Sequence, residues 1–324
     1  MVSNHGADDP HRAATYDADV VQVPRSLQQR AESFLAAGEA AVVSTPRDAA
    51  TVILLREASS AAPHSPEGRR AAGGAVAGDS GRPLEVYLLR RAATMAFAAG
   101  MHVFPGGSVD PRDADATISW VGPDAATWAG WLGCVEQLAL ALVCAAVRET
   151  FEESGVLLAG PDATSVVTTS GSATTRSAAS FSAEDLEADR LSLLDGSRSM
   201  AQVLAERSLV LRSDLLRPWS HWLTPEFEPK RFDTRFFVAA VPPGQTPRDV
   251  SGEADRTLWI EIDEAVRRHD AGDLAMLLPT SAALSDIAAL GGLDSVLRAP
   301  RRLHRILPRL VVEGGELSLV VDEP

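Results

Sequence analysis

Short apolar runs and longer segments with helical periodicity follow one another along most of the chain. Aliphatic and β-branched residues that run together between turn formers predict buried strands. Such runs occupy residues 50–55, 84–90, 215–223, 232–241 and 258–262. Near the end of the chain, residues 310–313 and 317–321 flank Gly314 and Gly315, which predicts a hairpin.

Helices are predicted where apolar residues recur every three or four positions. One begins near Arg25 and ends at Gly38, and a second follows the capping residue Asp124. The longest spans residues 136–154, is apolar all round in its first half and ends at Gly155, so we expect it to be buried. Further helices are predicted at 184–194, 200–206, 263–269 and 281–290. Strands interspersed with helices predict an α/β or α+β architecture.

Three segments lack a periodic face. Residues 1–24 are rich in Asp, Ala and His, and we expect a flexible N-terminal tail there, followed by a single domain over residues 25–324. Within that domain, residues 57–83 and 159–183 consist largely of small and polar residues. Both stretches have too little apolar bulk to pack, so they are predicted to be exposed loops.

The charge balance narrows the expected partners and location. The formal net charge of −14 repels a phosphate backbone, which argues against polymeric nucleic acid as a partner. The longest apolar run, residues 138–147, is about half as long as a membrane span requires, so no membrane association is expected. The first residues show no leader pattern, and the two cysteines, Cys134 and Cys144, are too few for a disulfide scaffold. A cytoplasmic protein is therefore expected.

The most informative segment is residues 148–156, which read Arg-Glu-Thr-Phe-Glu-Glu-Ser-Gly-Val. On a helix, Glu149, Glu152 and Glu153 lie at positions i, i+3 and i+4, so their carboxylates project from one face and repel one another. One interpretation is an acidic face in solvent. The other is a divalent-metal site, because hard oxygen ligands favour Mg²⁺ or Mn²⁺. The preceding apolar helix favours the second, because its end should emerge from a core into a cleft.

A glycine pair, Gly106 and Gly107, ends a predicted strand at a turn where the backbone can approach a ligand closely. Together with residues 148–156 it resembles the Nudix hydrolase signature, which reads Gly, five residues, Glu, seven residues, then Arg-Glu-U-x-Glu-Glu-x-Gly-U, where U is a bulky aliphatic. Gly107 begins the match, Asp113 stands where the family has Glu, and Thr150 replaces the first aliphatic.

The spacing inside this signature departs from the family. Asp113 and Arg148 are separated by 34 residues where the signature has seven, an insertion of 27 residues near 114–140. An interrupted box resembles the branch that includes the peroxisomal coenzyme A diphosphatases, and residues 88–107, 145–158 and 216–242 resemble that branch as well. The resemblance implies an α/β fold of the Nudix type, an α/β/α sandwich with a mixed sheet, an insertion inside the box and extra C-terminal helices.

The resemblance also implies roles for individual residues. Glu149, Glu152 and Glu153, with the Gly106 carbonyl, would bind Mg²⁺ or Mn²⁺, and Arg148 would orient a carboxylate. Gly107, Asp113 and Gly155 would support the box. The general base would be Glu152, Glu149 or the more distant Glu253. Basic residues suited to phosphate are Lys230, Arg231, Arg235 and Arg90, for which edge-strand surface charge is the alternative.

The function implied by the resemblance is metal-dependent hydrolysis of a phosphoanhydride in a nucleoside diphosphate linked to another moiety. Coenzyme A or acyl-coenzyme A is the first expected substrate, with ADP-ribose, NADH or an oxidised nucleoside triphosphate as alternatives. A noncatalytic nucleotide-sensing or interaction module is the rival interpretation. The insertion, with Trp120, Trp128 and Trp131, is expected to form a lid or a dimer contact, so a homodimer is one expected assembly.

Overall fold

The structure is a computed structural model that describes residues 20–58, 82–92, 98–168, 180–248 and 254–321. Its centre is a mixed sheet with the strand order β11-β3-β2-β10-β9-β12. β2 and β10 run parallel, and β2 pairs antiparallel with β3. The path consists of β2 (Arg47–Glu57), β3 (Leu84–Arg91), β9 (Arg217–Leu223), β10 (Phe232–Ala240), β11 (Ala254–Glu261) and β12 (Arg305–Ile306). Two short strands extend it, β4 (His102–Val103) on β3 and β5 (Gly106–Ser108) on β2.

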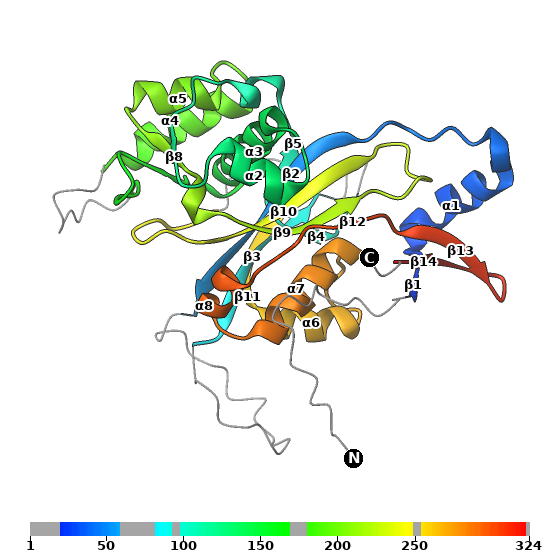
Figure 1. The fold of residues 1–324 in the computed structure, drawn as a ribbon. Helices are drawn as coiled ribbons and strands as arrows, with labels where there is room; N and C mark the ends of the chain where they lie inside the picture. Colours follow the sequence, from blue (N-terminus) through cyan, green and yellow to red (C-terminus); the bar gives the residue numbers. More distant parts are fainter. Residues whose placement is uncertain (1–19, 59–81, 93–97, 169–179, 249–253, 322–324) are drawn as a thin grey trace, which may run out of the picture.

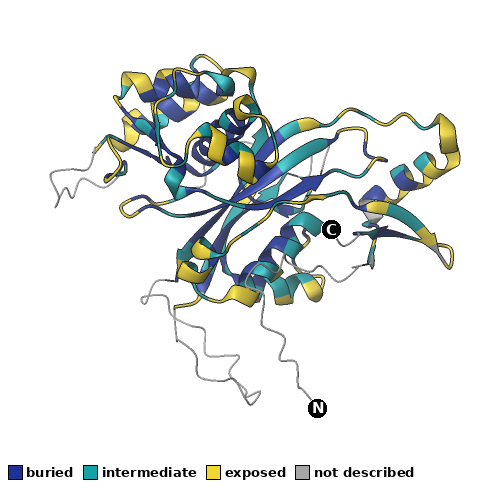
Figure 2. Cartoon of the chain, in the orientation of Figure 1, coloured by how far each residue is buried: buried dark blue, intermediate teal, exposed yellow. Residues whose placement is uncertain are grey.

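Helices cover both faces of this sheet (Figure 1). One face carries α2 (Ala125–Leu132) and α3 (Glu136–Ser154), and the other carries α6 (Ile262–Asp270), α7 (Leu278–Leu290) and α8 (Leu293–Arg298). Side chains alternate across β2, so Val52 and Leu54 pack in the cluster of α3 while Ile53 and Leu55 pack in the cluster of α7. Figure 2 shows the resulting burial along the central strands. The predicted α/β/α sandwich with a mixed sheet is confirmed.

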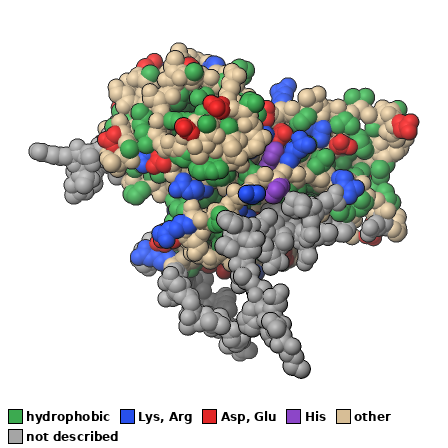
Figure 3. Space-filling view, viewed as in Figure 1, with side chains coloured by type: hydrophobic (Ala, Val, Ile, Leu, Met, Phe, Trp, Pro, Cys, Tyr) green, Lys and Arg blue, Asp and Glu red, His purple; other side chains and the backbone are tan. Residues whose placement is uncertain are grey.

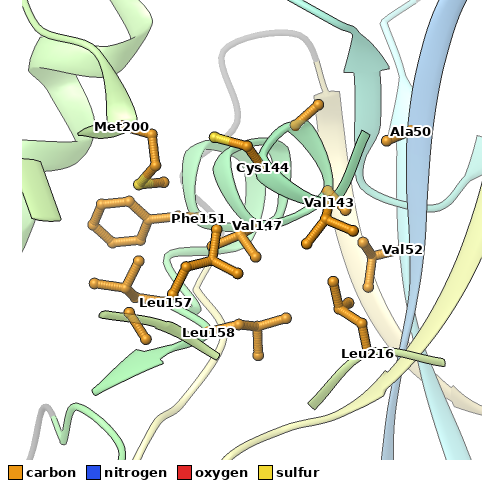
Figure 4. Packing of buried hydrophobic residues seen from close by; sticks show 14 of the residues in the cluster. Ala50, Val52, Val143, Cys144, Val147, Phe151, Leu157, Leu158, Met200 and Leu216 are labelled. Carbon is orange, nitrogen blue, oxygen red and sulfur yellow. The ribbon is translucent and has the colours of Figure 1, made fainter. Parts of the chain in front are cut away.

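The long helix α3 has the bounds that its sequence predicts. Its apolar first half faces the core, where Val143 lies beside Val52 of β2 and Val147 lies near Leu157 (Figure 4). At its end, Phe151 lies beside Met200 of α5 in the same view. Gly155 ends the helix in the left-handed conformation with φ 72°. The carboxylates on the last two turns are thereby fixed to a buried scaffold.

The insertion near 114–140 is part of the core. Asp124 caps α2 by accepting a hydrogen bond from the Thr127 amide, and α2 then packs against the beginning of α3. Trp128 is fully buried, with its ring 5.8 Å from that of Phe237 in β10, whereas Trp131 is partly exposed. In the described part of the chain no single helix is long and apolar enough to cross a membrane, and the pair α2–α3 meets that test only together, bent by 89°.

Two smaller units flank the sandwich (Figure 1). Beside α3 lie α4 (Ala183–Leu194) and α5 (Met200–Glu206), with the small sheet of β6 (Trp120–Val121), β8 (Val210–Arg212) and β7 (Ala159–Gly160). At the other end, α1 (Arg25–Ala37) packs near β1 (Val20–Gln22), β13 (Arg309–Glu313) and β14 (Glu316–Val320). Short 3-10 helices complete the described elements at Gly38–Ala40, Pro111–Ala114 and Ser213–Leu215. Over the visible face, Lys and Arg side chains are interspersed with Asp and Glu (Figure 3).

Three local expectations differ from the structure. Residues 20–22 of the expected tail pair with β14, which supplies the partner that the isolated sequence lacks. Gly106 and Gly107 lie in strand β5 rather than in a turn. Ala159 and Gly160 form β7, and Val167 is buried, so this part of the expected loop belongs to the core. Residues 59–81 and 169–179 of the two expected loops lie outside the described residues.

Candidate active site

Arg148 lies at the centre of the polar cluster on α3. Its Nε and Nη2 donate to the two carboxylate oxygens of Asp113, at 3.0 and 2.9 Å, and Nη2 also donates to the Ser108 carbonyl at 2.9 Å. Asp113 is 1% exposed and is held in turn by the Asp110 amide, because it closes a capping box on the 3-10 helix Pro111–Ala114. The orientation of the guanidinium is therefore fixed from both sides.

The remaining donor of Arg148 faces the box glutamates. Nη1 donates to Glu149 at 2.8 Å and to both carboxylate oxygens of Glu152 at 3.3 Å. Glu153 points to the neighbouring strand, where its Oε2 accepts the Gly106 amide at 2.9 Å. The structure thus brings together the predicted residues Arg148, Glu149, Glu152 and Glu153 with the two glycines of β5.

The glycines of β5 are required by close packing. A Cβ added at Gly107 would collide with the Glu149 carboxylate, whose Cδ would lie 2.7 Å away. At Gly106 it would lie 2.8 Å from the Thr51 Cα of β2. The backbone of β5 therefore has contact with α3 through Gly107 and with β2 through Gly106, which only glycine permits.

Gly107→Ala is expected to displace the Glu149 carboxylate and to reduce any activity of the box by about tenfold or more. The control is Gly130→Ala, because a Cβ at Gly130 on α2 meets nothing within 4 Å and alanine favours the helix. Both purified variants are compared with the parent protein in kcat/KM and in melting temperature. Equal kcat/KM for all three would contradict the role assigned to this contact.

Burial dominates the electrostatics of the cluster. It raises the pKa of Glu149 to about 7, because loss of hydration disfavours the carboxylate more than the adjacent Arg148 charge favours it. It raises the pKa of Glu152 as well. For Arg148 burial opposes ionisation, but the Asp113 hydrogen bond and the charges of Glu149 and Asp113 outweigh it and raise the pKa. Three buried carboxylates share one guanidinium, so the cluster is deficient in positive charge.

The donor chemistry of this cluster fits a hard divalent cation, because carboxylate oxygens are the ligands such ions take and their charge is incompletely balanced. The carboxylates are not yet gathered around a common point. Among the residues that the structure describes, no group of three or more His, Cys, Asp or Glu side chains is arranged to hold a metal ion. Arg148 Nη1 contacts both Glu149 and Glu152, so metal coordination requires these two side chains to reorient.

Comparison with known proteins shows which family this cluster resembles. The family model described as the NUDT19 Nudix domain matches residues 134–285, which include α3. The crystal structure of a NUDIX hydrolase from Alicyclobacillus acidocaldarius is similar in fold, with a TM-score of 0.57 and 26% identity over 81% of this chain and 99% of that one. Residues 134–285 therefore resemble a Nudix domain, and the chain is similar in fold to a Nudix hydrolase.

Curated Nudix relatives indicate the branch. The acyl-coenzyme A diphosphatase NUDT19 of Gallus gallus is 25% identical over 73% of this chain and 68% of its own length. That of Xenopus laevis is 23% identical over 72% and 65%, and the putative nudix hydrolase 7 of Caenorhabditis elegans is 29% identical over 71% and 65%. The chain thus spans about two thirds of the length of these relatives, and its resemblance to the coenzyme A diphosphatase branch is confirmed.

A cavity of about 280 Å³ opens beside the Nudix box. Box residues form one wall, and the connection between α4 and α5, residues 193–200, forms the other. Arg112 lines this cavity, donates to the Gly196 carbonyl at 2.9 Å and is paired with Asp110. No local sequence pattern points to Arg112 or to residues 193–200. They come close to the box only through tertiary contacts.

The four predicted phosphate-binding residues make their contacts away from the box cluster. Arg90 is paired with Asp255 across β3 and β11, and Lys230 is near the Phe232 ring. Arg231 is buried and donates to the carbonyls of Thr224 and Ser44, while Arg235 joins Asp48 and Asp233 in a network that also holds His221. Glu253 lies outside the described residues, and its predicted role stays a prediction.

Proposed function

We propose that this Nudix protein hydrolyses the diphosphate of a nucleoside diphosphate linked to another moiety, with acyl-coenzyme A as the first substrate and coenzyme A as the second. The observation that carries the proposal is the box cluster itself, in which Glu149 and Glu152 are held by one guanidinium at the end of a buried helix. The choice of substrate is supported by the curated relatives, which are named acyl-coenzyme A diphosphatases.

The proposed reaction requires Mg²⁺ or Mn²⁺, held by Glu149, Glu152 and Glu153 with the Gly106 carbonyl as a further oxygen ligand. A bound divalent cation neutralises phosphate oxygens and lowers the pKa of a water molecule. Glu153 already lies against β5, where it accepts the Gly106 amide, so the carbonyl of the same residue is at the edge of the site.

The protein's own residues supply position and proton transfer. Asp113 fixes the Arg148 guanidinium, and Arg148 holds Glu149 and Glu152 beside the site until they turn toward a bound cation. The carboxylate that accepts the proton of the attacking water is Glu152, Glu149 or the more distant Glu253. Arg112 is the exposed basic side chain in the cavity beside the box and suits a phosphate oxygen there.

Mass-spectrometric detection of products tests this proposal. The purified protein is incubated with Mg²⁺ and with octanoyl-coenzyme A, coenzyme A, ADP-ribose, NADH or 8-oxo-dGTP. We expect acyl-coenzyme A to be hydrolysed at its diphosphate by one water into adenosine 3′,5′-bisphosphate and the acylated phosphopantetheine, and EDTA to abolish the cleavage. If no compound is cleaved while a nucleotide raises the melting temperature, the noncatalytic sensing module is the better account.

A further inference from the structure

A second cavity lies on the opposite face of the sheet from the box helix. Its volume is about 690 Å³, within the range of about 300 to 1,000 Å³ that is typical of small-molecule sites. Its lining residues come from the sheet, from α7 and from β1, α1 and β14. Much of its wall is apolar, formed by Phe104, Trp222, Phe236, Met276, Leu277 and Leu319.

The charged residues of this wall disfavour a phosphate group, although Arg30 is paired with Glu228 and Arg301 with Asp286, and His269 also lines the cavity. Glu228, Asp270 and Asp286 line the cavity, and no Lys or Arg is found among its described lining residues. Glu228 is 2% exposed and its Oε2 accepts Arg30 at 2.9 Å, but its buried Oε1 has no hydrogen-bond partner among the described residues. A buried acceptor of this kind favours a neutral ligand with N–H or O–H donors over an anion.

The cavity and the Nudix box share one segment of chain. Val103 and Phe104 line the cavity, and Gly107 lies against the Glu149 carboxylate. Four peptide units separate Val103 from Gly107, so their Cα atoms are at most about 15 Å apart. Thr51, which pairs with Gly106, also lines the cavity. β5 pairs with β2 alone among the described strands, so its other edge has no described strand partner.

We propose that this cavity binds the uncharged, apolar arm of the substrate, the fatty acyl chain with its amide-bearing linker, while the diphosphate lies at the box. The inference rests on the proposed function for the position of the diphosphate. The apolar wall accommodates the chain, the unpartnered Glu228 oxygen matches an amide donor, and the lining offers no described Lys or Arg to a phosphate. The cavity therefore selects acylated substrates over those with a second nucleotide or a sugar.

A binding experiment tests the cavity without any catalysis. The probe is S-octanoylpantetheine, which is neutral and has no phosphate, and its binding is measured by calorimetry against octanoate and adenosine. We expect the neutral probe to bind at least tenfold more tightly than octanoate, because octanoate brings a negative charge to an acidic wall. Affinity should also rise from the S-acetyl to the S-octanoyl compound, because each added methylene buries apolar surface. Tighter binding of adenosine at this site would overturn the assignment.

Two variants of α7 locate the probe. Ala282 lines the cavity and is half-buried, whereas Ala289 on the same helix is exposed and is absent from the lining. Ala282→Phe should weaken S-octanoylpantetheine binding at least tenfold, and Ala289→Phe should leave it unchanged. Ser285→Phe, at an exposed lining position, provides the same test if Ala282→Phe does not fold. Unchanged binding in a folded lining variant would overturn the proposal.

Kinetics separate this inference from the proposed function. In the parent protein kcat/KM for octanoyl-coenzyme A should exceed that for acetyl-coenzyme A, and Ala282→Phe should reduce this ratio at least tenfold. If the diphosphate is cleaved but the ratio is the same in both proteins, the cavity assignment is wrong and the hydrolase stands. If nothing is cleaved but the probe binds and Ala282→Phe prevents it, the cavity assignment stands and the hydrolase is wrong.

Discussion

Glu152→Gln is expected to reduce kcat/KM for the cleaved substrate by a factor of about 10² to 10⁴, the range for loss of a general base or of a comparable charged group. Glu152 is buried, projects from the last turns of α3 and meets Arg148 Nη1 through both carboxylate oxygens. Glutamine has the same shape and still accepts a hydrogen bond from Arg148, so the fold is retained. Only the negative charge is lost, and with it the ability to accept a proton or to hold a cation.

The matched control for this variant lies on the same helix. Glu136 is exposed in the first turn of α3, far from the box, and Glu136→Gln should leave kcat/KM within about twofold of the parent. Activity and melting temperature are measured for both variants in the same Mg²⁺ concentration. A folded Glu152→Gln protein with undiminished kcat/KM would show that the chemistry is performed elsewhere.

Local patterns predicted most of the fold because long elements carry their own signals. The bounds of α3 follow from an apolar helical segment with a glycine at its end, and β2, β3 and β10 follow from continuous aliphatic runs. The shorter strands were missed, because two- or three-residue strands such as β8 exist only through their neighbours. Strand β1 is a similar case, since it is held by β14 from the other end of the chain.

The sequence likewise predicted one part of the candidate site and missed another. Glu149, Glu152 and Glu153 share a helix face by spacing alone, so their proximity was predictable. The approach of β5 was implied only by the family resemblance, and the wall formed by residues 193–200 had no sequence signal. The basic residues 230, 231 and 235 were expected near phosphate because of their type, but ion pairs and carbonyl contacts within the sheet occupy Arg231 and Arg235.

The Nudix box tolerates its long insertion because the residues on either side of the insertion contact each other. Asp113 before the insertion and Arg148 after it are joined by three hydrogen bonds, so the inserted segment begins and ends at neighbouring positions. The inserted residues contribute to the core, because α2 packs on α3 and buries Trp128 against the sheet. Sequence spacing therefore says little about the spacing of the site, whereas this one buried ion pair determines it.

Arg148→Ala is expected to lower the free energy of unfolding by about 3 to 5 kcal/mol, the cost of leaving a buried charge without its partner. Asp113 is 2% exposed at its side chain and Arg148 is 11% exposed, so water cannot replace the guanidinium. The comparison is Arg298→Ala, whose pair with Asp294 is about 80% exposed on both sides and should contribute less than about 1 kcal/mol. Urea unfolding in EDTA measures both losses.

A double variant separates the charge effect from simple loss of packing. If Arg148→Ala destabilises because Asp113 is left charged and buried, then Asp113→Ala in the same chain should recover part of the lost stability, giving a coupling of about 1 to 3 kcal/mol. The loss caused by Arg148→Ala should also be smaller at pH 5 than at pH 8. Glu149, whose pKa is already raised to about 7 by burial, would then be protonated and would no longer repel Glu152. Additive losses with no pH dependence would mean that Arg148 acts by packing, and the Asp113–Arg148 pair would not be what holds the interrupted box together.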